Sequence, residues 1–344
     1  MSDNKWNLKL VRAREAFSML PRSGGDDEVD WGEVEIAQID TGYTEHPVFG
    51  PWPNGRSEIL RVEDGLNLIE SGQLPSDPLD YKGNPAHGTR ILSVICGDLP
   101  GSFVGVAPGV PTIPYRAICS VVLASKRSRK RVAESIRHAV DTNSAEVISM
   151  SLGIPKLSAF GQRHLGEAVD HAYERGVIVV AAGGQIIDRV TYPGKFSRTI
   201  GVGGVSPDRT VWFEYDESMA ERSIDIWGPA DDVRRANSEL RDGQVVEGPF
   251  GEGDGTSYAT GHVAAAAAMW LAFHGDELDS AYPEPWQRVE AFRKLIQSTS
   301  QDVEGDYWPN KDRGILNIEA LLKAKLPAAS GLKFQKREAA KEVF

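Results

Sequence analysis

Short apolar runs recur along this chain, two of them ending at aspartate or glycine, and they alternate with stretches of helical periodicity. The runs VEIAQID, VISMSLG and TIGVGGV cover residues 34–40, 147–153 and 199–205, and each is almost continuously apolar. Between them, RVAESIRHAV (131–140) and HLGEAVDHAYERG (164–176) have the apolar periodicity of amphipathic helices. Strands buried on both faces read in this way. The sequence therefore predicts a three-layer, doubly wound α/β fold with a mostly parallel central sheet.

We expect one such domain with an extension at each end. Residues 1–30 form an N-terminal arm, with a short helical piece at residues 11–20 followed by an acidic turn. The main domain covers residues 31–325, which contain no internal repeat and no linker. Residues 326–344 are polar, and we expect a loosely held C-terminal extension.

The charge balance and the hydropathy exclude some classes of function. The chain has 344 residues and a net charge of −11, which argues against nucleic acid as the main partner because phosphate binding needs clustered cations. One basic run, KRSRKR at 126–131, is either a solvated helix face or a docking patch. The first residues lack the apolar segment of a signal peptide, and the longest apolar run, residues 263–273, is too short to span a bilayer. We therefore expect a cytoplasmic protein without membrane contact, with a trimmed secreted chain as the alternative.

The two cysteines, Cys96 and Cys119, show neither metal-ligand spacing nor a disulfide framework. Both lie in or beside apolar surroundings, so we expect buried, reduced thiols without a catalytic role. No group of ligand residues has a recognisable metal-binding spacing. The sequence therefore predicts neither a metal nor another cofactor.

Three polar residues occupy positions at which the predicted fold could form a catalytic site. Asp40 ends the first strand, His87 precedes Gly88, and Ser257 begins an alanine-rich helix. Each alone has a simpler interpretation, as a turn residue, a structural histidine or a helix cap. Together, Asp, His and Ser can convert a hydroxyl group into a nucleophile. The small Gly88 would let the His87 backbone approach a ligand, and the helix N-terminus at Ser257 would favour developing negative charge.

Seven groups of segments resemble the successive motifs of the subtilisin family, in the family's order over about residues 30 to 320. They are AQIDTGYTEHP, AHGTRILSVICG, GVAPGV, VISMSLG, VIVVAAGG with TYPGKF and TIGVGGV, IDIWGPADDV, and GTSYATGHVAAAAA. The chain order Asp, His, Ser is also that of subtilisin. The resemblance implies a serine protease of the peptidase S8 type. In it, Asp40 would orient the histidine, His87 would be the general base and Ser257 the nucleophile.

The resemblance also implies where an extended peptide substrate would bind. One segment resembles the edge that pairs with the substrate backbone, a mode known as β-augmentation. A second resembles the wall of the pocket for the residue before the scissile bond. The edge residues are Ser151, Leu152 and Gly153, and the wall residues are Ala181, Ala182 and Gly183.

The sequence departs from the family's pattern near the oxyanion hole. Gly184 stands where the family usually has an asparagine whose amide helps to hold the oxyanion, and Gln185 follows it. We expect a hole that consists of the Ser257 backbone N–H and a donor at Gly184 or Gln185, and an enzyme that is slow or completed by a regulatory partner. Gly261 stands where the family has proline, which we interpret as structural variation. Structural calcium is common in the family, but no ligand cluster here supports it.

Three functions are compatible with these residues. The first is an endopeptidase that hydrolyses peptide bonds through an acyl-enzyme. The second is a ligase or macrocyclase, in which an amine resolves the same acyl-enzyme. The third is a peptide-binding module with the same fold and little turnover. The Asp–His–Ser set favours catalysis, whereas Gly184 favours the module.

Overall fold

A sheet of six parallel strands forms the centre of the molecule, with the strand order β4-β1-β5-β6-β7-β8. The computed structural model describes residues 5–23, 28–155, 162–216, 224–248, 250–307 and 313–338. The strands are β1 (Ile36–Asp40), β4 (Thr112–Arg116), β5 (Val147–Met150), β6 (Ile178–Ala182), β7 (Ile200–Val205) and β8 (Ile226–Pro229). All residues of these six strands are buried, as expected of strands covered on both faces.

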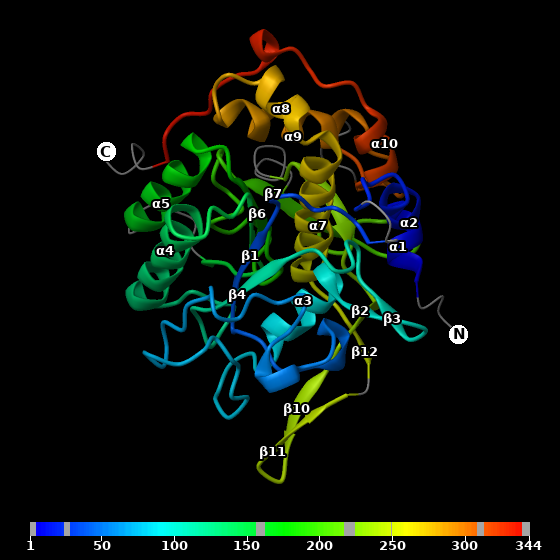
Figure 1. Cartoon of the computed structure of the whole chain (residues 1–344). Helices are drawn as coiled ribbons and strands as arrows, with labels where there is room; N and C mark the ends of the chain where they lie inside the picture. Colours follow the sequence, from blue (N-terminus) through cyan, green and yellow to red (C-terminus); the bar gives the residue numbers. More distant parts are fainter. Residues whose placement is uncertain are drawn as a thin grey trace.

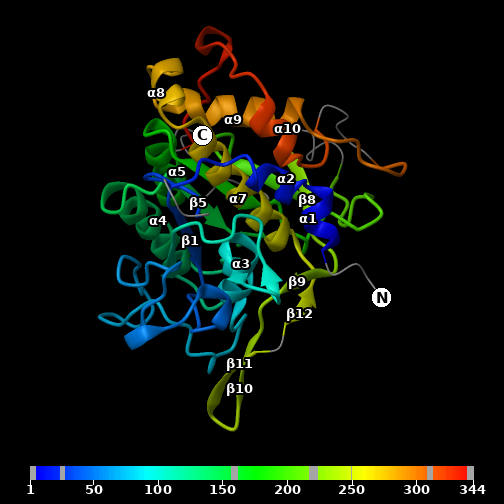
Figure 2. The same cartoon turned by 45° about the vertical axis from the view of Figure 1, so that its right-hand side comes forward.

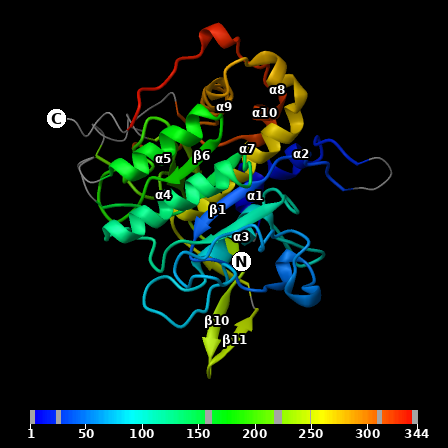
Figure 3. The same cartoon turned by 60° about the vertical axis from the view of Figure 1, so that its left-hand side comes forward.

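Helices cover both faces of this sheet (Figures 1 and 3). On one face lie α3 (His87–Cys96) and α7 (Thr256–His274), and on the other lie α4 (Lys126–Asp141) and α5 (Arg163–Glu174). Each pair forms a separate apolar core with the sheet residues that point toward it. The predicted α/β fold with a parallel central sheet is therefore confirmed.

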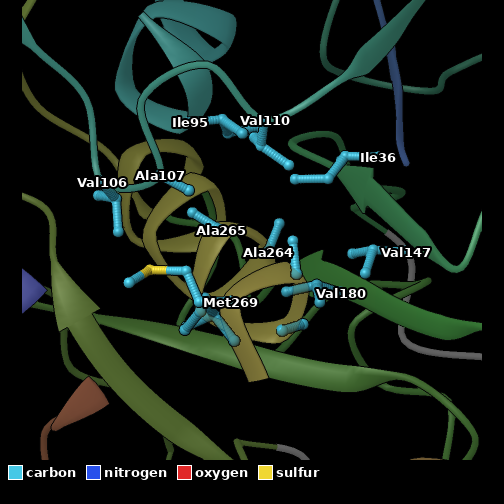
Figure 4. Close-up of a cluster of buried hydrophobic side chains, with 14 of the residues drawn as sticks. Ile36, Ile95, Val106, Ala107, Val110, Val147, Val180, Ala264, Ala265 and Met269 are labelled. Carbon is cyan, nitrogen blue, oxygen red and sulfur yellow. The ribbon is translucent and has the colours of Figure 1, made fainter. Parts of the chain in front are cut away.

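The alanine-rich helix α7 lies against the middle of the sheet. From Thr256 to Leu271 every residue except Ser257 is buried, which explains why this helix is apolar on all sides. Figure 4 shows Ala264 and Met269 of α7 in the same cluster as Val180 of β6 and Ile36 of β1. Small alanine side chains allow the helix axis to approach the strands closely, so the first turn of α7 is held rigidly over the sheet.

The order of the strands identifies the edge at which a ligand would bind. The chain passes from β1 to β4 on one side and then returns to β5 on the other side of β1. In parallel sheets, ligands bind outside the carboxyl ends of the strands at such a reversal. Asp40 is the last residue of β1, and Ser151 directly follows β5.

The remaining elements surround this framework. Helices α8, α9 and α10 lie together at one end of the molecule, and a hairpin of β10 and β11 projects from the opposite end (Figure 2). Their bounds are α8 (Asp276–Ala281), α9 (Trp286–Ser298), α10 (Ile318–Lys323), β2 (Asp98–Leu99), β3 (Phe103–Val104), β9 (Val233–Arg235), β10 (Ser238–Arg241), β11 (Gln244–Glu247) and β12 (Gly251–Gly253). Among the described residues, no helix has both the length and the apolar character needed to cross a membrane.

The N-terminal arm is part of the main core. It contains two short helices, α1 (Trp6–Leu10) and α2 (Ala13–Phe17), where the sequence predicted one helical piece at residues 11–20. Arg12 separates them, because its left-handed conformation (φ 57°) ends the first helix. Their apolar side chains are buried with the core around α7, namely Leu8, Val11, Ala13, Ala16 and Leu20.

The C-terminal extension is tied to the domain, so the expectation of a loosely held segment is wrong for residues 326–338. The buried Arg198 donates to the backbone carbonyl of Gln335 (2.8 Å from Nη2), and Glu338 is only 3% exposed. The Glu338 carboxylate accepts a hydrogen bond from the Ser197 backbone N–H (2.6 Å). In Figure 1 this red segment passes from the α8–α9 end toward α5. Its polar residues are therefore hydrogen-bond partners of the domain.

A buried histidine links the arm to α7. His262 donates from Nδ1 to the Tyr258 carbonyl (2.7 Å), and its Nε2 lies 2.9 Å from Asn7 Nδ2 and accepts the amide proton. Burial lowers the pKa of His262 from 6.5 to about 4. The unfolded chain therefore binds more protons than the folded one between these pH values, and stability falls as pH falls through this window.

We expect the melting temperature to decrease as pH is lowered from 6.5 toward 4, and His262→Gln to weaken this dependence, with His46, whose pKa burial also lowers to about 4, contributing part of what remains. The lowered pKa corresponds to roughly 3 kcal/mol of stability lost at the acid end. Thermal unfolding followed by circular dichroism at several pH values measures it. His164→Gln, at an exposed histidine, is the control and should keep the wild-type slope. An unchanged slope in His262→Gln would contradict the assignment.

Candidate active site

Asp40, His87 and Ser257 come together at the carboxyl edge of the sheet. His87 Nδ1 lies 2.8 and 2.9 Å from the two carboxylate oxygens of Asp40, and His87 Nε2 lies 3.2 Å from Ser257 Oγ. The chain thus brings the last residue of β1, the first residue of α3 and the first turn of α7 into one line of hydrogen bonds. The imidazole can accept the serine proton on one nitrogen while its other N–H donates to the carboxylate.

The Asp40 carboxylate is completely buried. A buried carboxylate is costly unless it accepts hydrogen bonds. Besides His87, the Thr41 backbone N–H donates to Asp40 Oδ1 at 2.7 Å. These donors compensate the burial and fix the direction in which the carboxylate faces.

The start of α3 is held by a residue that the sequence analysis did not single out. Asp77 is 4% exposed, and its Oδ2 accepts the backbone N–H of Ala86 (2.9 Å) and the hydroxyl of Tyr81 (3.0 Å). Ala86 has a left-handed conformation (φ 60°) and directly precedes His87. Burial raises the pKa of the Asp77 carboxyl. A single aspartate in a loop gives no sequence signal for this role, because its partners are assembled only by the fold.

Gly88 has a packing role that the sequence analysis did not predict. A Cβ at Gly88 would lie 2.1 Å from the carbonyl oxygen of Gly42, so the glycine permits the loop after β1 to pack against the first turn of α3. The Gly88 N–H donates to Thr41 Oγ1 at 2.9 Å. This contact brings the segment that carries Asp40 next to the helix that carries His87.

The region of the predicted oxyanion hole contains a network around Thr256. Gln185 Oε1 accepts hydrogen bonds from the Thr256 backbone N–H and hydroxyl, both at 3.0 Å. Because the acceptor must face Thr256, the Nε2 amide group points elsewhere. The Gly184 N–H donates to Thr256 Oγ1 at 3.2 Å, so it is already engaged. Among the hydrogen bonds of the described residues, the Gly184 N–H thus has a partner and the Gln185 Nε2 group has none.

An asparagine would not fit at position 184. Gly184 has φ +91°, and a Cβ built there would lie 2.8 Å from Thr191 Oγ1 and 2.9 Å from Thr191 Cγ2. Side chains other than glycine rarely adopt this conformation. The glycine in the usual asparagine position is therefore required by its neighbour Thr191.

A small pocket opens beside Ser257, with a volume of about 80 Å³. Of the predicted wall residues, Ala182 lines it, whereas Ala181 lies in the core behind α4 and α5, and Gly183 packs under Tyr215. All three edge residues line it as well. The described lining residues are Val121, Val122, Ser151, Leu152, Gly153, Pro155, Ala182, Gly184, Gln185, Ile186, Thr191, Thr256 and Ser257.

The predicted edge for the substrate backbone is occupied at Gly153. The Gly153 N–H donates to the Val121 carbonyl at 2.8 Å, and the Leu123 N–H donates to the Gly153 carbonyl at 2.9 Å. Ser151 lies next to the nucleophile, since its hydroxyl donates to the Ser257 carbonyl at 3.0 Å. Residues 121–123 thus form a strand-like pair with the segment predicted to receive the substrate.

Three carboxylates that the sequence spacing did not reveal lie close together near the start of α7. Side-chain oxygens of Asp231, Asp232 and Asp254 lie within 4.8 Å of one another. Two of the three residues are exposed, and Asp254 accepts the Asp232 backbone N–H at 2.9 Å. Exposed acidic groups of this kind also occur in loops that bind no ion.

Neither cysteine is in a disulfide: Cys96 is buried, as expected, and Cys119 is only partly buried. Burial raises the pKa of Cys96 to about 12, so its thiolate form is suppressed. We expect iodoacetamide to leave turnover of the native protein largely intact. Peptide cleavage after alkylation measures this, with mass spectrometry to count the modified cysteines. Rapid inactivation would show that a thiol contributes to the site.

A parallel α/β sheet with Asp40, His87 and Ser257 at its carboxyl edge is the arrangement of a serine hydrolase. A family model for the subtilase family of peptidases matches residues 32–315. The chain therefore belongs to the subtilase family.

Curated relatives agree with this assignment, and a solved structure shares the fold. The chain is 27% identical over 294 residues to subtilisin E of Bacillus subtilis (strain 168), covering 83% of this chain and 65% of that protein. It is 27% identical over 304 residues to the major intracellular serine protease of the same organism, covering 85% of this chain and 81% of the relative. The fold is similar to that of the prenylagaramide maturation protease PagA, with a TM-score of 0.64, 20% identity, and coverage of 90% and 98%.

Proposed function

We propose that the protein is a serine endopeptidase that hydrolyses peptide bonds through an acyl-enzyme on Ser257. The observation that carries the proposal is the continuous hydrogen-bond line from Asp40 through His87 to Ser257. Membership of the subtilase family supports the same chemistry. The line also favours catalysis over the alternative of a peptide-binding module, since binding alone needs no relay to a serine hydroxyl.

In the proposed mechanism His87 acts first as a general base. Its Nε2 takes the proton of Ser257 Oγ as the oxygen attacks the substrate carbonyl carbon, and the resulting imidazolium is stabilised by Asp40. The imidazolium then protonates the leaving amine, and the serine ester that remains is hydrolysed by water activated in the same way. These steps use no metal ion, so a chelator should not act by removing a catalytic one.

The oxyanion formed in the first step would be held by two donors. One is the backbone N–H of Ser257 in the first turn of α7, where the helix N-terminus favours negative charge. The other is Gln185 Nε2. Its orientation follows from the two hydrogen bonds that Gln185 Oε1 accepts from Thr256, the residue next to the nucleophile.

The substrate would be a peptide in extended conformation whose side chain before the scissile bond enters the pocket beside Ser257. The apolar wall residues Leu152 and Ala182 and the exposed Ile186 support this placement. The product distinguishes hydrolysis from ligation or cyclisation, because only hydrolysis adds water to the mass of the fragments.

A serine-directed fluorophosphonate tests the proposal. The purified full chain is incubated with the reagent, digested and analysed by mass spectrometry to locate the adduct. We expect a single adduct on Ser257, because only this hydroxyl faces a general base in the described site. Labelling of another serine, or none together with no cleavage of unfolded proteins, would refute the proposed function.

A further inference from the structure

Thr191 lines the pocket beside Ser257 and lies next to both Gly153 and Gly184, so we call its side chain the floor of the pocket. Thr191 is 4% exposed and lines the pocket. Its backbone N–H and its hydroxyl both donate to the Gly183 carbonyl, at 2.8 and 3.2 Å. A β-branched side chain is stiff at χ1, and the hydroxyl bond fixes its rotamer. The floor is therefore held in place.

Thr191 lies between two of the glycines that line the pocket, Gly153 and Gly184. A Cβ on Gly153 would lie 2.4 Å from Thr191 Oγ1, and a Cβ on Gly184 would lie 2.8 Å from the same atom. One threonine side chain thus occupies the volume that side chains at positions 153 and 184 would otherwise share. The two glycines make room for Thr191 and do not leave an open cavity.

The backbone next to Thr191 is also hydrogen-bonded to the segment that follows Gly153. The Ile154 N–H donates to the Tyr192 carbonyl at 2.8 Å, which joins the segment after Gly153 to the segment after Thr191. These bonds do not involve residues 121–123. The Thr191 side chain can therefore keep its position when a peptide displaces residues 121–123.

The volume that remains is small. With Val121 and Val122 in its lining, it is about 80 Å³, whereas an engineered cavity of about 150 Å³ holds a benzene ring. Opening residues 121–123 widens that side of the pocket, but Thr191 still limits its depth. None of the described residues that line the pocket carries a charge, so an arginine or lysine side chain would be buried without a partner. An aromatic ring would overpack the site.

We propose that this pocket selects a small uncharged side chain, alanine or serine in size, immediately before the scissile bond, and that Thr191 sets the limit. The inference rests on the proposed peptidase function. Thr191 is a specificity-determining residue in this scheme, because its methyl and hydroxyl groups occupy the depth that a larger substrate side chain would need.

The test compares two peptides that differ only in that residue, alanine against phenylalanine, by their kcat/KM values. We expect wild type to prefer alanine by at least about 10²-fold, the upper range for pocket-size discrimination. Thr191→Ala should reduce the preference at least tenfold by deepening the pocket. Thr191→Val keeps the volume and loses only the hydroxyl bond, so it should keep the wild-type preference. The ratio within one variant does not depend on how much of that variant is folded.

A wild-type preference for phenylalanine, or an equal ratio in Thr191→Ala and wild type, would overturn the inference while leaving the peptidase function intact. A second measurement does not need turnover. In Ser257→Ala, calorimetry measures the affinity for cleaved peptides that end in alanine or phenylalanine. Tighter binding of the alanine peptide, reversed or abolished by adding Thr191→Ala, supports the role of Thr191. Loss of all labelling and cleavage with this selectivity retained would instead reject the proposed function alone.

Discussion

Replacing Ser257 with alanine is expected to abolish both fluorophosphonate labelling and peptide cleavage. The hydroxyl is the atom that faces His87 Nε2 at 3.2 Å, and no acyl-enzyme can form without it. In subtilisin, removing the serine or the histidine of the triad each lowers kcat by about 2 × 10⁶-fold. His87→Ala should therefore lose about as much as Ser257→Ala, and the double variant should lose little more, because residues that act as a unit are not additive.

Initial rates on a peptide substrate, with melting temperatures of each variant, check this expectation. Ser280→Ala is a suitable control, since Ser280 is an exposed serine in α8, and it should keep the wild-type rate. Cleavage that survives Ser257→Ala, in a preparation free of other proteases, would remove Ser257 from the mechanism. Strictly additive losses in the double variant would argue that the two side chains do not act together.

The second large effect is expected at Gln185. Removing a side-chain donor from the oxyanion hole of subtilisin costs about 10²–10³ in kcat. Gln185→Met deletes the Nε2 donor at similar side-chain length, and we expect a comparable loss in kcat with KM little changed. The donor acts on charge that exists only in the transition state, so ground-state binding should not depend on it.

A matched variant separates this role from a purely structural one. Gln185→Glu keeps an oxygen that can accept from Thr256 N–H and Oγ1–H but has no N–H. If Gln185 only caps the start of α7, Gln185→Glu should retain both kcat and the melting temperature, since an acidic group suits a helix N-terminus. If it holds the oxyanion, Gln185→Glu should lose kcat while the melting temperature is kept. Wild-type kcat in both variants would rule out Gln185 as the donor.

The sequence could predict the fold, and the meeting of Asp40, His87 and Ser257 at one edge of the sheet, because their signals are local. Each stands at the end of a strand or the start of a helix, and the apolar pattern locates those ends within a few residues. Strand β1, for example, ends at Asp40 as the run VEIAQID predicted. Topology then brings these ends to one edge of the sheet.

The features that the sequence could not predict depend on contacts between distant segments. Thr191 gives no sequence signal for a role in the pocket, because its contacts with Gly153 and Gly184 are formed only in the fold. The polar residues Gln335 and Glu338 looked like solvated ones because their partner, Arg198, lies far away in the sequence. The same holds for Ala181, whose motif predicted a pocket wall but whose side chain faces the core.

The pairing of residues 121–123 with Gly153 has a consequence for how the enzyme would respond to substrates of different length. A peptide that needs the Gly153 N–H and carbonyl can bind only to the population of molecules in which the bonds to Val121 and Leu123 are open. Its apparent affinity is then the intrinsic affinity multiplied by that fraction. A small serine-directed reagent pairs with no strand and samples every molecule. Any partner or substitution that loosens residues 121–123 would therefore accelerate the cleavage of long peptides and leave the labelling of Ser257 unchanged.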